Sequence, residues 1–401
     1  MRRNFIIGCL LAILPGSYIL AQGQKGLETN LKVLAQEQKG FEIVGHIEGL
    51  KEGEKVLLKL FHDNGFHEFT DWTRADSAYV YNGEFRLRGF APDGPRMYWM
   101  EFNRHPNNVI RLLLDTGQIS IYSSNIEKIP HMFLDGVVKI TGSASNNAVH
   151  ALVPATQMYL QSYFRINNVL KQIKDSIGFD STLISGVMMA KQAVMAALYN
   201  AYLAHFEDDY KPAALHIIDG GMFERTDHAS FWMDVYNNLD EHEKNSFYGK
   251  RLKEKLPLCV GQPFPSFNLP NADGRSLSLS NGLGKLTIVH FWAENSYNRQ
   301  EMQQELLGIY KQYHSKGLNV LAISSDNNIK RWKDVLKADQ FPWLNVIDVK
   351  GKMVDSVYHE LGPPETHNTT NVVLDAEGKI IAWDVLGVEL QWYVWKYLQS
   401  K

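Results

Sequence analysis

The chain has 401 residues, which by length alone is enough for two or three domains. Apolar residues make up 45% of it and charged residues 21%, a balance that is typical of globular proteins and excludes a disordered or fibrous one. The 41 basic and 44 acidic residues give a net charge of −3, and no long basic run interrupts the sequence. These charges exclude a nucleic-acid-binding protein that acts through a basic patch.

The first 21 residues predict a secretory signal peptide. Arg2 and Arg3 form a short positive start, an apolar run broken by Pro15 and Gly16 follows, and Ala21 precedes polar residues. The run is too short and too interrupted for a membrane span. We therefore expect an exported protein of the periplasm or cell envelope, with a linker over residues 22–40.

The two cysteines, Cys9 and Cys259, restrict the redox chemistry. Cys9 ends an Ile-Ile-Gly-Cys sequence similar to a lipoprotein box, so lipidation and membrane attachment at Cys9 are the alternative to cleavage after Ala21. Cleavage is favoured because more apolar residues follow Cys9. The mature chain then keeps Cys259 alone, which cannot form an intramolecular disulfide, and we expect it to be a buried apolar residue.

Residues 41–145 predict an all-β, sandwich-like domain. Apolar and polar residues alternate from Phe41 to Ile47, and Asn82-Gly83 between two alternating runs is a strong hairpin signal. Regularly spaced short strands favour a sandwich or barrel. Further strands are expected at residues 55–60, 96–102, 109–114, 119–122 and 137–141.

Residues 146–258 change to the three- and four-residue spacing of helices. The segment Leu183–Phe206 is apolar enough to consider a membrane span, but Lys191 near its middle would be costly in a bilayer. We expect instead a buried helix packed between two domains. The helices are expected at residues 147–175, 181–206, 212–222, 229–239 and 241–256.

Residues 259–401 predict an α/β domain in which strands alternate with helices before a closing hairpin and a last helix. Three segments are apolar on both faces, as the central strands of a sheet covered by helices require: 286–291, 320–323 and 372–374. We expect them to be neighbours in a sheet of four or five strands.

Several ordered motifs in this last domain are similar to a known family. They are Gly261-Gln262-Pro263, Phe291-Trp292-Ala293, Glu301-Met302, Ser324-Ser325-Asp326 and Leu374-Asp375 with Gly378-Lys379-Ile380. With them the domain resembles the thioredoxin-like domain of TlpA-like proteins and of the alkyl hydroperoxide reductase/thiol-specific antioxidant (AhpC/TSA) superfamily. Residues 41–145 resemble, more loosely, the β-rich domain of unknown function that is often fused upstream of such domains.

The resemblance implies a Cys-x-x-Cys pair after Phe291-Trp292-Ala293, and this chain has none. Counted forward from that motif, the cysteine positions fall on Ser296 and Arg299. Counted back from the helix that starts at Arg299, they fall on Asn295 and Asn298. The family's cis-proline position corresponds to about Thr369.

No catalytic, cofactor-binding or metal-ligating residue is assigned. Thiol–disulfide exchange needs a thiolate and a resolving thiol, which serine, asparagine and arginine cannot replace. The 14 histidines are scattered without ligand spacing, the carboxylates form no recognisable acid–base pair, and Ser296 lacks the glycines of a nucleophile elbow.

The sequence thus favours a redox-inactive binding or scaffold protein of the cell envelope. Its degenerate active-site positions, which would contact a polypeptide or a small acidic ligand, are Trp292, Asn295, Ser296, Asn298, Arg299 and Thr369. The helix N-terminus and the charge of Arg299 would favour a carboxylate. The alternative at this site is that Asn295, Ser296 or Asn298 merely caps the helix.

The alternative function is a TlpA-like thiol–disulfide oxidoreductase or peroxiredoxin-like protein that works by non-standard chemistry. Intermolecular chemistry through Cys259 in a dimer belongs to this alternative, and a buried Cys259 would exclude it.

Overall fold

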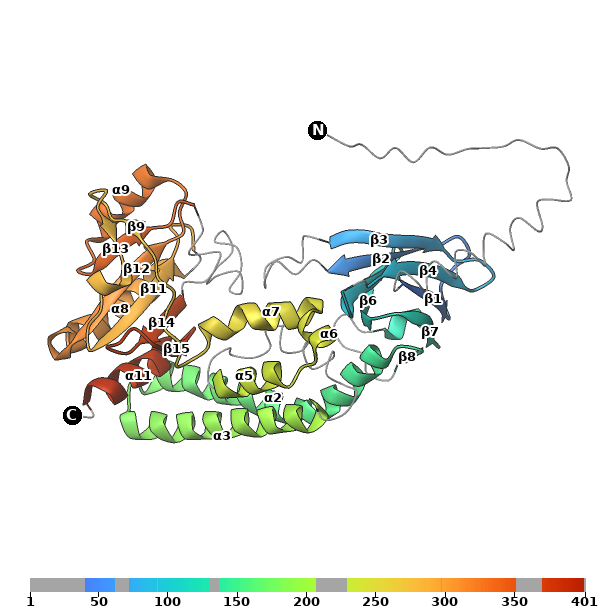
Figure 1. Cartoon of the computed structure of the whole chain (residues 1–401), viewed down its shortest axis with the longest axis horizontal. Helices are drawn as coiled ribbons and strands as arrows, with labels where there is room; N and C mark the ends of the chain where they lie inside the picture. The colour runs from blue at the N-terminus through green and yellow to red at the C-terminus, as the bar shows by residue number, and fades with distance from the viewer. Residues whose placement is uncertain are drawn as a thin grey trace, which may run out of the picture.

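The computed structural model describes residues 40–61, 72–91, 93–129, 137–206, 229–296, 298–350 and 370–399. Three parts follow one another along the chain: β-sheets, a helical middle and a mixed α/β domain, which confirms the predicted fold class (Figure 1). The signal segment, the predicted linker except its last residue, Gly40, the predicted helix at 212–222 and Thr369 lie outside the described residues. Predictions about them, and the predicted domain boundaries, stay predictions.

The described N-terminal residues form two four-stranded sheets. The first has the order β4-β1-β7-β8, with bounds Phe85–Phe90, Gly40–Ile47, Gly117–Ser123 and Val138–Thr141. The second has the order β3-β2-β5-β6, with bounds Trp72–Tyr79, Lys55–Phe61, Arg96–Phe102 and His105–Leu114. Inward side chains of both sheets share one core, in which the rings of Phe41 and Tyr98 lie 5.1 Å apart, so the predicted sandwich is confirmed.

The hairpin prediction at Asn82-Gly83 is correct for the turn and wrong for the strands. Both residues have positive φ angles, 51° and 75°, and Tyr81 and Glu84 exchange backbone hydrogen bonds of 2.8 and 3.1 Å. Beyond this turn β3 pairs with β2, and β4 pairs with β1, so the two strands enter opposite sheets. A local turn signal cannot specify these pairings because they depend on the sandwich as a whole.

The helical region contains a long antiparallel pair, α2 (Ala144–Ser176) and α3 (Ser181–Phe206), with shorter helices packed beside it. The shorter helices are α5 (Ala229–Asn237), α6 (Glu241–Lys244) and α7 (Phe247–Lys255). The helix predicted at 241–256 is in fact broken at Asn245 and Ser246. Ser246 caps α7 by accepting the Gly249 N–H at 3.1 Å, and the Phe247 N–H donates to the Asp93 carbonyl at 2.7 Å.

Helix α3 only partly fits the prediction of a buried helix. Its inner face, with Met195, Leu198 and Tyr202, joins the core of the helical region. Its opposite face is exposed, and Met189 there is 69% exposed. By length and composition α3 is also the one described helix that could cross a membrane.

The described C-terminal residues form a five-stranded sheet in the order β13-β12-β11-β14-β15. Their bounds are Leu344–Ile347, Leu318–Ser324, Leu286–Trp292, Thr370–Leu374 and Ile380–Trp383. Strands β11, β12 and β13 are parallel, and β14 and β15 run antiparallel to their neighbours. Every residue of β11 is buried, and β12 and β14 flank it, which confirms the predicted central strands.

The described part of this domain also contains the α-helices α8 (Arg299–Tyr313), α9 (Ile329–Asp339) and α11 (Gly387–Gln399). A short hairpin precedes the sheet, formed by β9 (Leu269–Pro270) and β10 (Ser276–Leu277). Strand β13 was not among the predicted strands, because four residues are too few to show a period.

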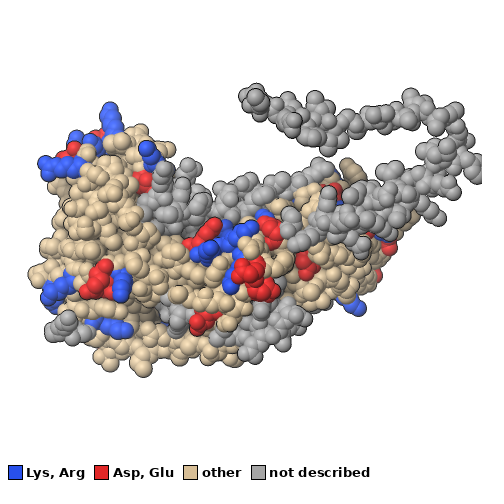
Figure 2. Space-filling model, viewed as in Figure 1, with Lys and Arg blue, Asp and Glu red and all other residues tan. Residues whose placement is uncertain are grey.

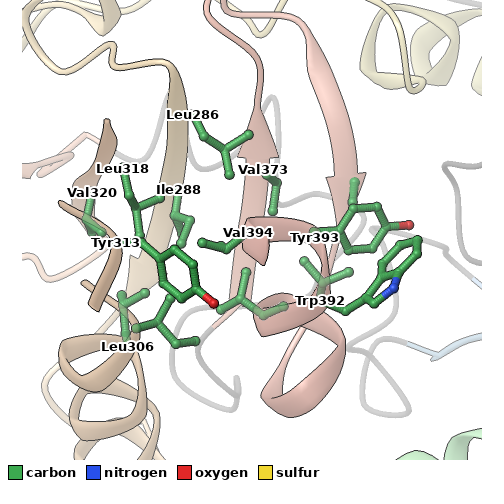
Figure 3. Close-up of a cluster of buried hydrophobic side chains, with 14 of the residues drawn as sticks. Leu286, Ile288, Leu306, Tyr313, Leu318, Val320, Val373, Trp392, Tyr393 and Val394 are labelled. Atoms are coloured by element: carbon green, nitrogen blue, oxygen red, sulfur yellow. The ribbon is translucent and has the colours of Figure 1, made fainter. Parts of the chain in front are cut away.

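The core on one face of the sheet is shared with the helical region. Figure 3 shows Leu286 and Ile288 of β11 and Val373 of β14 packed against side chains of α8 and α11. Four residues from the tip of the α2–α3 pair belong to the same cluster: Leu170, Ile173, Ile184 and Met188. On this face the core of the α/β domain therefore includes side chains of the helical region, whereas the core that contains Val289 and Phe291 of β11 is a separate cluster.

A buried ion pair connects the same two parts. The Lys191 Nζ of α3 donates to both carboxylate oxygens of Glu389 in α11, at 2.9 and 3.0 Å, and only 2% of the Lys191 side chain is exposed. The Trp392 indole N–H also donates to Ser185 Oγ at 2.9 Å. These bonds fix α11 to α3. Because α11 packs on one face of the sheet, they also fix the sheet relative to α3.

A second buried polar contact lies inside the sheet. Asn371 Nδ2 donates to the Val385 carbonyl at 3.1 Å, so its Oδ1 accepts from His290 Nδ1 at 2.8 Å. His290 Nε2 is then unprotonated, and no described group hydrogen-bonds to it. Burial lowers the pKa of His290 to about 4.

Replacing Lys191 with methionine should lower the free energy of unfolding by about 3 kcal/mol or more, because Glu389 keeps a charge in a site that water barely reaches. The double variant Lys191→Met/Glu389→Leu should recover much of that loss. Urea unfolding measures both. As a control, Lys244→Ala, which removes an exposed pair with Glu241, should change stability by no more than about 0.5 kcal/mol. A single variant as stable as wild type would show that the pair does not hold the two parts together.

His290 should make stability pH-dependent in acid. Its pKa is about 4 when folded and about 6.5 when unfolded, so between these values the unfolded chain binds the extra proton. Stability contributed by neutral His290 is complete above pH about 6.5 and declines by about 3 kcal/mol as the pH falls to about 4. Urea unfolding across this range should show a shallower decline for His290→Gln than for wild type. If the unfolding free energies of wild type and His290→Gln declined in parallel with falling pH, His290 would not be the group responsible.

Candidate functional site

The predicted site lies between the carboxyl end of β11, at Trp292, and the N-terminus of α8, at Arg299. The structure brings Trp292, Asn295, Ser296, Asn298 and Arg299 together there because they are consecutive or nearly so in the chain. Thr369, the sixth predicted residue and the one that corresponds to the family's cis-proline, lies outside the described residues. The neighbouring strand β12 ends at the same edge, which is where α/β sheets bind ligands.

Ser296 forms the turn. Its Oγ accepts the Ala293 N–H at 3.1 Å, its own N–H donates to the Ala293 carbonyl at 3.2 Å, and its carbonyl accepts the Arg299 N–H at 3.2 Å. Asn298 occupies the N-cap position of α8, but its side chain does not cap the helix. Its φ and ψ, −109° and 15°, lie outside the extended region that a capping side chain normally needs.

Residues after β12 hold the other side of the turn. The carboxylate of Asp326 accepts the Glu294 N–H at 3.1 and 3.2 Å and the Ser324 hydroxyl at 2.6 Å. The Ser325 N–H donates to the Trp292 carbonyl at 3.0 Å. In the sequence, Ser324-Ser325-Asp326 indicates a family resemblance and nothing about the site. The signal that could have placed these residues in the site is that parallel strands β11 and β12 end at one edge of the sheet.

The charge of Arg299 is already neutralised, which corrects the expectation of a free cation at this site. Its Nη1 forms an ion pair with Asp339 of α9 and donates to Gln303 Oε1 at 3.0 Å. The guanidinium lies 5.8 Å from the centre of the Trp292 ring, and 11% of the Arg299 side chain is exposed. Arg299 therefore packs α8 against α9 and β11 instead of presenting a charge to solvent.

Trp292 also belongs to the core and not to the surface. It is buried among the apolar residues between the sheet and its helices, and its indole N–H has no hydrogen-bond partner among the described residues. Asn295 is exposed, and Ser296 and Asn298 are half-buried. Among the described residues of this turn, those that a ligand could reach are therefore polar.

The thiol of Cys259 lies elsewhere. Cys259 is 3% exposed in the core of the helical region, with its Sγ 3.8 Å from the Lys255 carbonyl, so the prediction of a buried cysteine is confirmed. This burial is unfavourable to the intermolecular alternative, which needs a Cys259 thiol that a second chain can approach. No group of three or more His, Cys, Asp or Glu side chains suited to a metal ion occurs in the part of the chain that the structure describes.

Two family matches cover much of the chain. Residues 260–383 match the AhpC/TSA family, and residues 41–149 match a domain of unknown function, DUF4369. Among the similar curated proteins, thiol-disulfide oxidoreductase ResA of Bacillus cereus is 24% identical over 147 residues, which are 37% of this chain and 81% of ResA. Thioredoxin-like protein YneN of Bacillus subtilis is 26% identical over 136 residues, 34% of this chain and 76% of YneN.

Similar solved structures each cover about a third of the chain. A thiol:disulfide interchange protein from a Bacteroides species is 26% identical with a TM-score of 0.31, covering 35% of this chain and 91% of that protein. A thiol-disulfide oxidoreductase from Bacteroides fragilis is 29% identical with a TM-score of 0.30. The match covers 34% of this chain and 98% of that protein. Because both scores lie below 0.5, the assignment depends on the family matches. The chain therefore carries a C-terminal thioredoxin-like domain of the AhpC/TSA family, of the TlpA and ResA type, behind an N-terminal DUF4369 domain, and it has only two cysteines and no Cys-x-x-Cys pair.

Proposed function

We propose that this protein is an exported binding or scaffold protein of the cell envelope whose thioredoxin-like domain performs no thiol–disulfide exchange. One observation carries the proposal. The turn between β11 and α8, where the family places its two sulfurs, contains Asn295, Ser296, Asn298 and Arg299 and no cysteine.

The remaining thiol does not replace the missing pair. Exchange requires a thiolate that can approach a disulfide sulfur, and reactive thiols lie in accessible sites such as helix N-termini beside positive charges. Cys259 is enclosed by apolar side chains of the helical region, among them Tyr248 and Leu252. A substrate sulfur would have to enter that core to react.

A polypeptide is the ligand that we favour for the turn. Hydrogen bonds that Ser296 Oγ and the Asp326 carboxylate accept from backbone N–H groups hold the turn in place, so its polar groups need little ordering when a ligand arrives. Amide and hydroxyl groups such as those of Asn295 and Ser296 can pair with an extended peptide backbone. A small acidic ligand is less well supported, because Asp339 already neutralises Arg299.

Export is part of the proposal and depends on the signal pattern of residues 1–21. Attachment by lipidation at Cys9 is the alternative form of the same localisation. The cell fraction and the mass of a Cys9→Ser variant distinguish the two, since only lipidation at Cys9 would be lost with it.

The chain from Gln22 onward should not reduce insulin or consume peroxide faster than dithiothreitol alone, because no accessible thiol remains. The measurement is turbidity of reduced insulin and loss of peroxide, with an active thioredoxin as positive control. Cys259→Ser should behave as wild type. Turnover above the dithiothreitol baseline that disappears in Cys259→Ser would overturn the proposal and favour the oxidoreductase alternative.

A neutral extended peptide and an acidic peptide of equal length should perturb the turn equally in an NMR titration. The reason is that backbone pairing, and not the neutralised Arg299, would hold the ligand. Arg299→Ala should leave both responses unchanged. A response to the acidic peptide alone that is lost in Arg299→Ala would identify an acidic-ligand site instead. No response to either peptide would remove the binding role from this turn.

A further inference from the structure

The turn between β3 and β4 contains an asparagine and a glycine that can react with each other. Asn82 is exposed, and its backbone N–H donates to the Glu52 carboxylate at 3.0 Å. Gly83 follows it with a φ of 75°. Among the described residues, none accepts a hydrogen bond from the Gly83 N–H and none bonds to the Asn82 side-chain amide. Both reacting groups are therefore available.

An asparagine followed by glycine can cyclise without an enzyme. The glycine backbone nitrogen attacks the asparagine side-chain carbon Cγ, the N–Cγ bond forms, and the Cγ–Nδ2 bond breaks. Ammonia leaves and takes the proton of the attacking nitrogen with it. Water then opens the succinimide ring at either of its two carbonyls, which gives aspartate or isoaspartate. Glycine favours the first step because it has no Cβ to hinder the approach.

A second pair of the same kind, Asn281-Gly282, is held by the fold. Gly282 is buried, and its N–H donates to the Leu279 carbonyl at 2.9 Å. Asn281 Oδ1 accepts the Ser278 N–H at 2.8 Å and the Ser278 hydroxyl at 3.1 Å. Both reacting groups of this pair are therefore occupied, although Asn281 is itself exposed. The third pair in the sequence, Asn64-Gly65, lies outside the described residues.

We propose that Asn82 is a deamidation site, at which the folded protein slowly converts asparagine to aspartate and isoaspartate. The bonds that hold the turn do not use the reacting groups. Tyr81 and Glu84 bond to each other, and Asn82 bonds to Glu52 through its own N–H. Local opening of an exposed two-residue turn costs little free energy, so the Asn82 side chain can rotate toward the Gly83 nitrogen.

The modification changes the connection between the two sheets of the sandwich. A carboxylate at position 82 adds a negative charge beside Glu52, and Glu84 is two residues away. Figure 2 shows further acidic side chains on the surface of the sandwich, at the right of the molecule. Isoaspartate also adds a methylene group to the main chain, which the two-residue turn from β3 to β4 does not accommodate. We therefore expect the modified chain to unfold at a lower urea concentration.

Peptide mapping of the chain from Gln22 onward, incubated folded in mildly alkaline buffer, tests the proposal. Trypsin puts the three pairs into separate peptides, residues 60–74, 75–86 and 276–285. Mass spectra should show replacement of the amide by an acid at least about tenfold faster in 75–86 than in 276–285, because three hydrogen bonds protect Asn281 and Gly282. An isoaspartyl methyltransferase should label 75–86. In urea the two peptides should react at similar rates, since the fold no longer distinguishes them.

Asn82→Gly is the matched control, because glycine accepts the φ of 51° and has no side-chain amide, while the other two pairs remain. Its urea midpoint should stay constant during the incubation, whereas the wild-type midpoint falls as 75–86 is converted. The proposal is overturned if 75–86 stays unmodified in the folded protein, or if 75–86 and 276–285 react at equal rates there. Conversion of 75–86 without a fall in the wild-type midpoint would overturn the effect on stability.

Discussion

The ion pair between Lys191 and Glu389 connects the helical region to the thioredoxin-like domain, and the rest of the architecture depends on that connection. A charged lysine this deep in a protein is tolerated only with a partner at hydrogen-bond distance, and the carboxylate of Glu389 uses both oxygens. Because Glu389 lies at the start of α11, the pair also fixes the helix that covers one face of the sheet. The tip of the α2–α3 pair then completes the apolar core on that face. The helical region is thus a structural part of the C-terminal domain as well as a connection to the β-sandwich.

This arrangement explains how the fold persists without the family's sulfurs. The sheet is stabilised by a fully buried β11, by its neighbours β12 and β14 and by the shared core, none of which needs a cysteine. The turn that would hold the dithiol is kept in place by Ser296, Asp326 and Ser325. Arg299 and Asp339 join α8 to α9 beside it. The turn at the position of the family's dithiol is therefore well structured although it contains no cysteine.

Features set by local pattern could be predicted from the sequence. Strands β11 and β14 were predicted because they are apolar on both faces, and the turn at Asn82-Gly83 because few residue pairs accept two positive φ angles. Features that depend on residues far apart in the sequence could not be predicted from it. The break before α7 depends on the Asp93 carbonyl, and the pairing of β3 and β4 depends on the opposite sheets of the sandwich. For the same reason the site's charge was mispredicted: Asp339, the partner of Arg299, lies on another helix, and nothing in the sequence near Arg299 announces it.

The protein retains a thioredoxin-like domain in which no cysteine occupies the family's active-site turn, and its Cys259 is buried. Counting reactive thiols in the chain from Gln22 onward, natively and in denaturant, tests this claim most directly. Cys259 is the one cysteine in that chain and is 3% exposed. The predicted result is a negligible fast reaction with a thiol reagent in the native protein and one thiol per chain after unfolding. A thiol that reacts rapidly and stoichiometrically in the native protein would contradict the account.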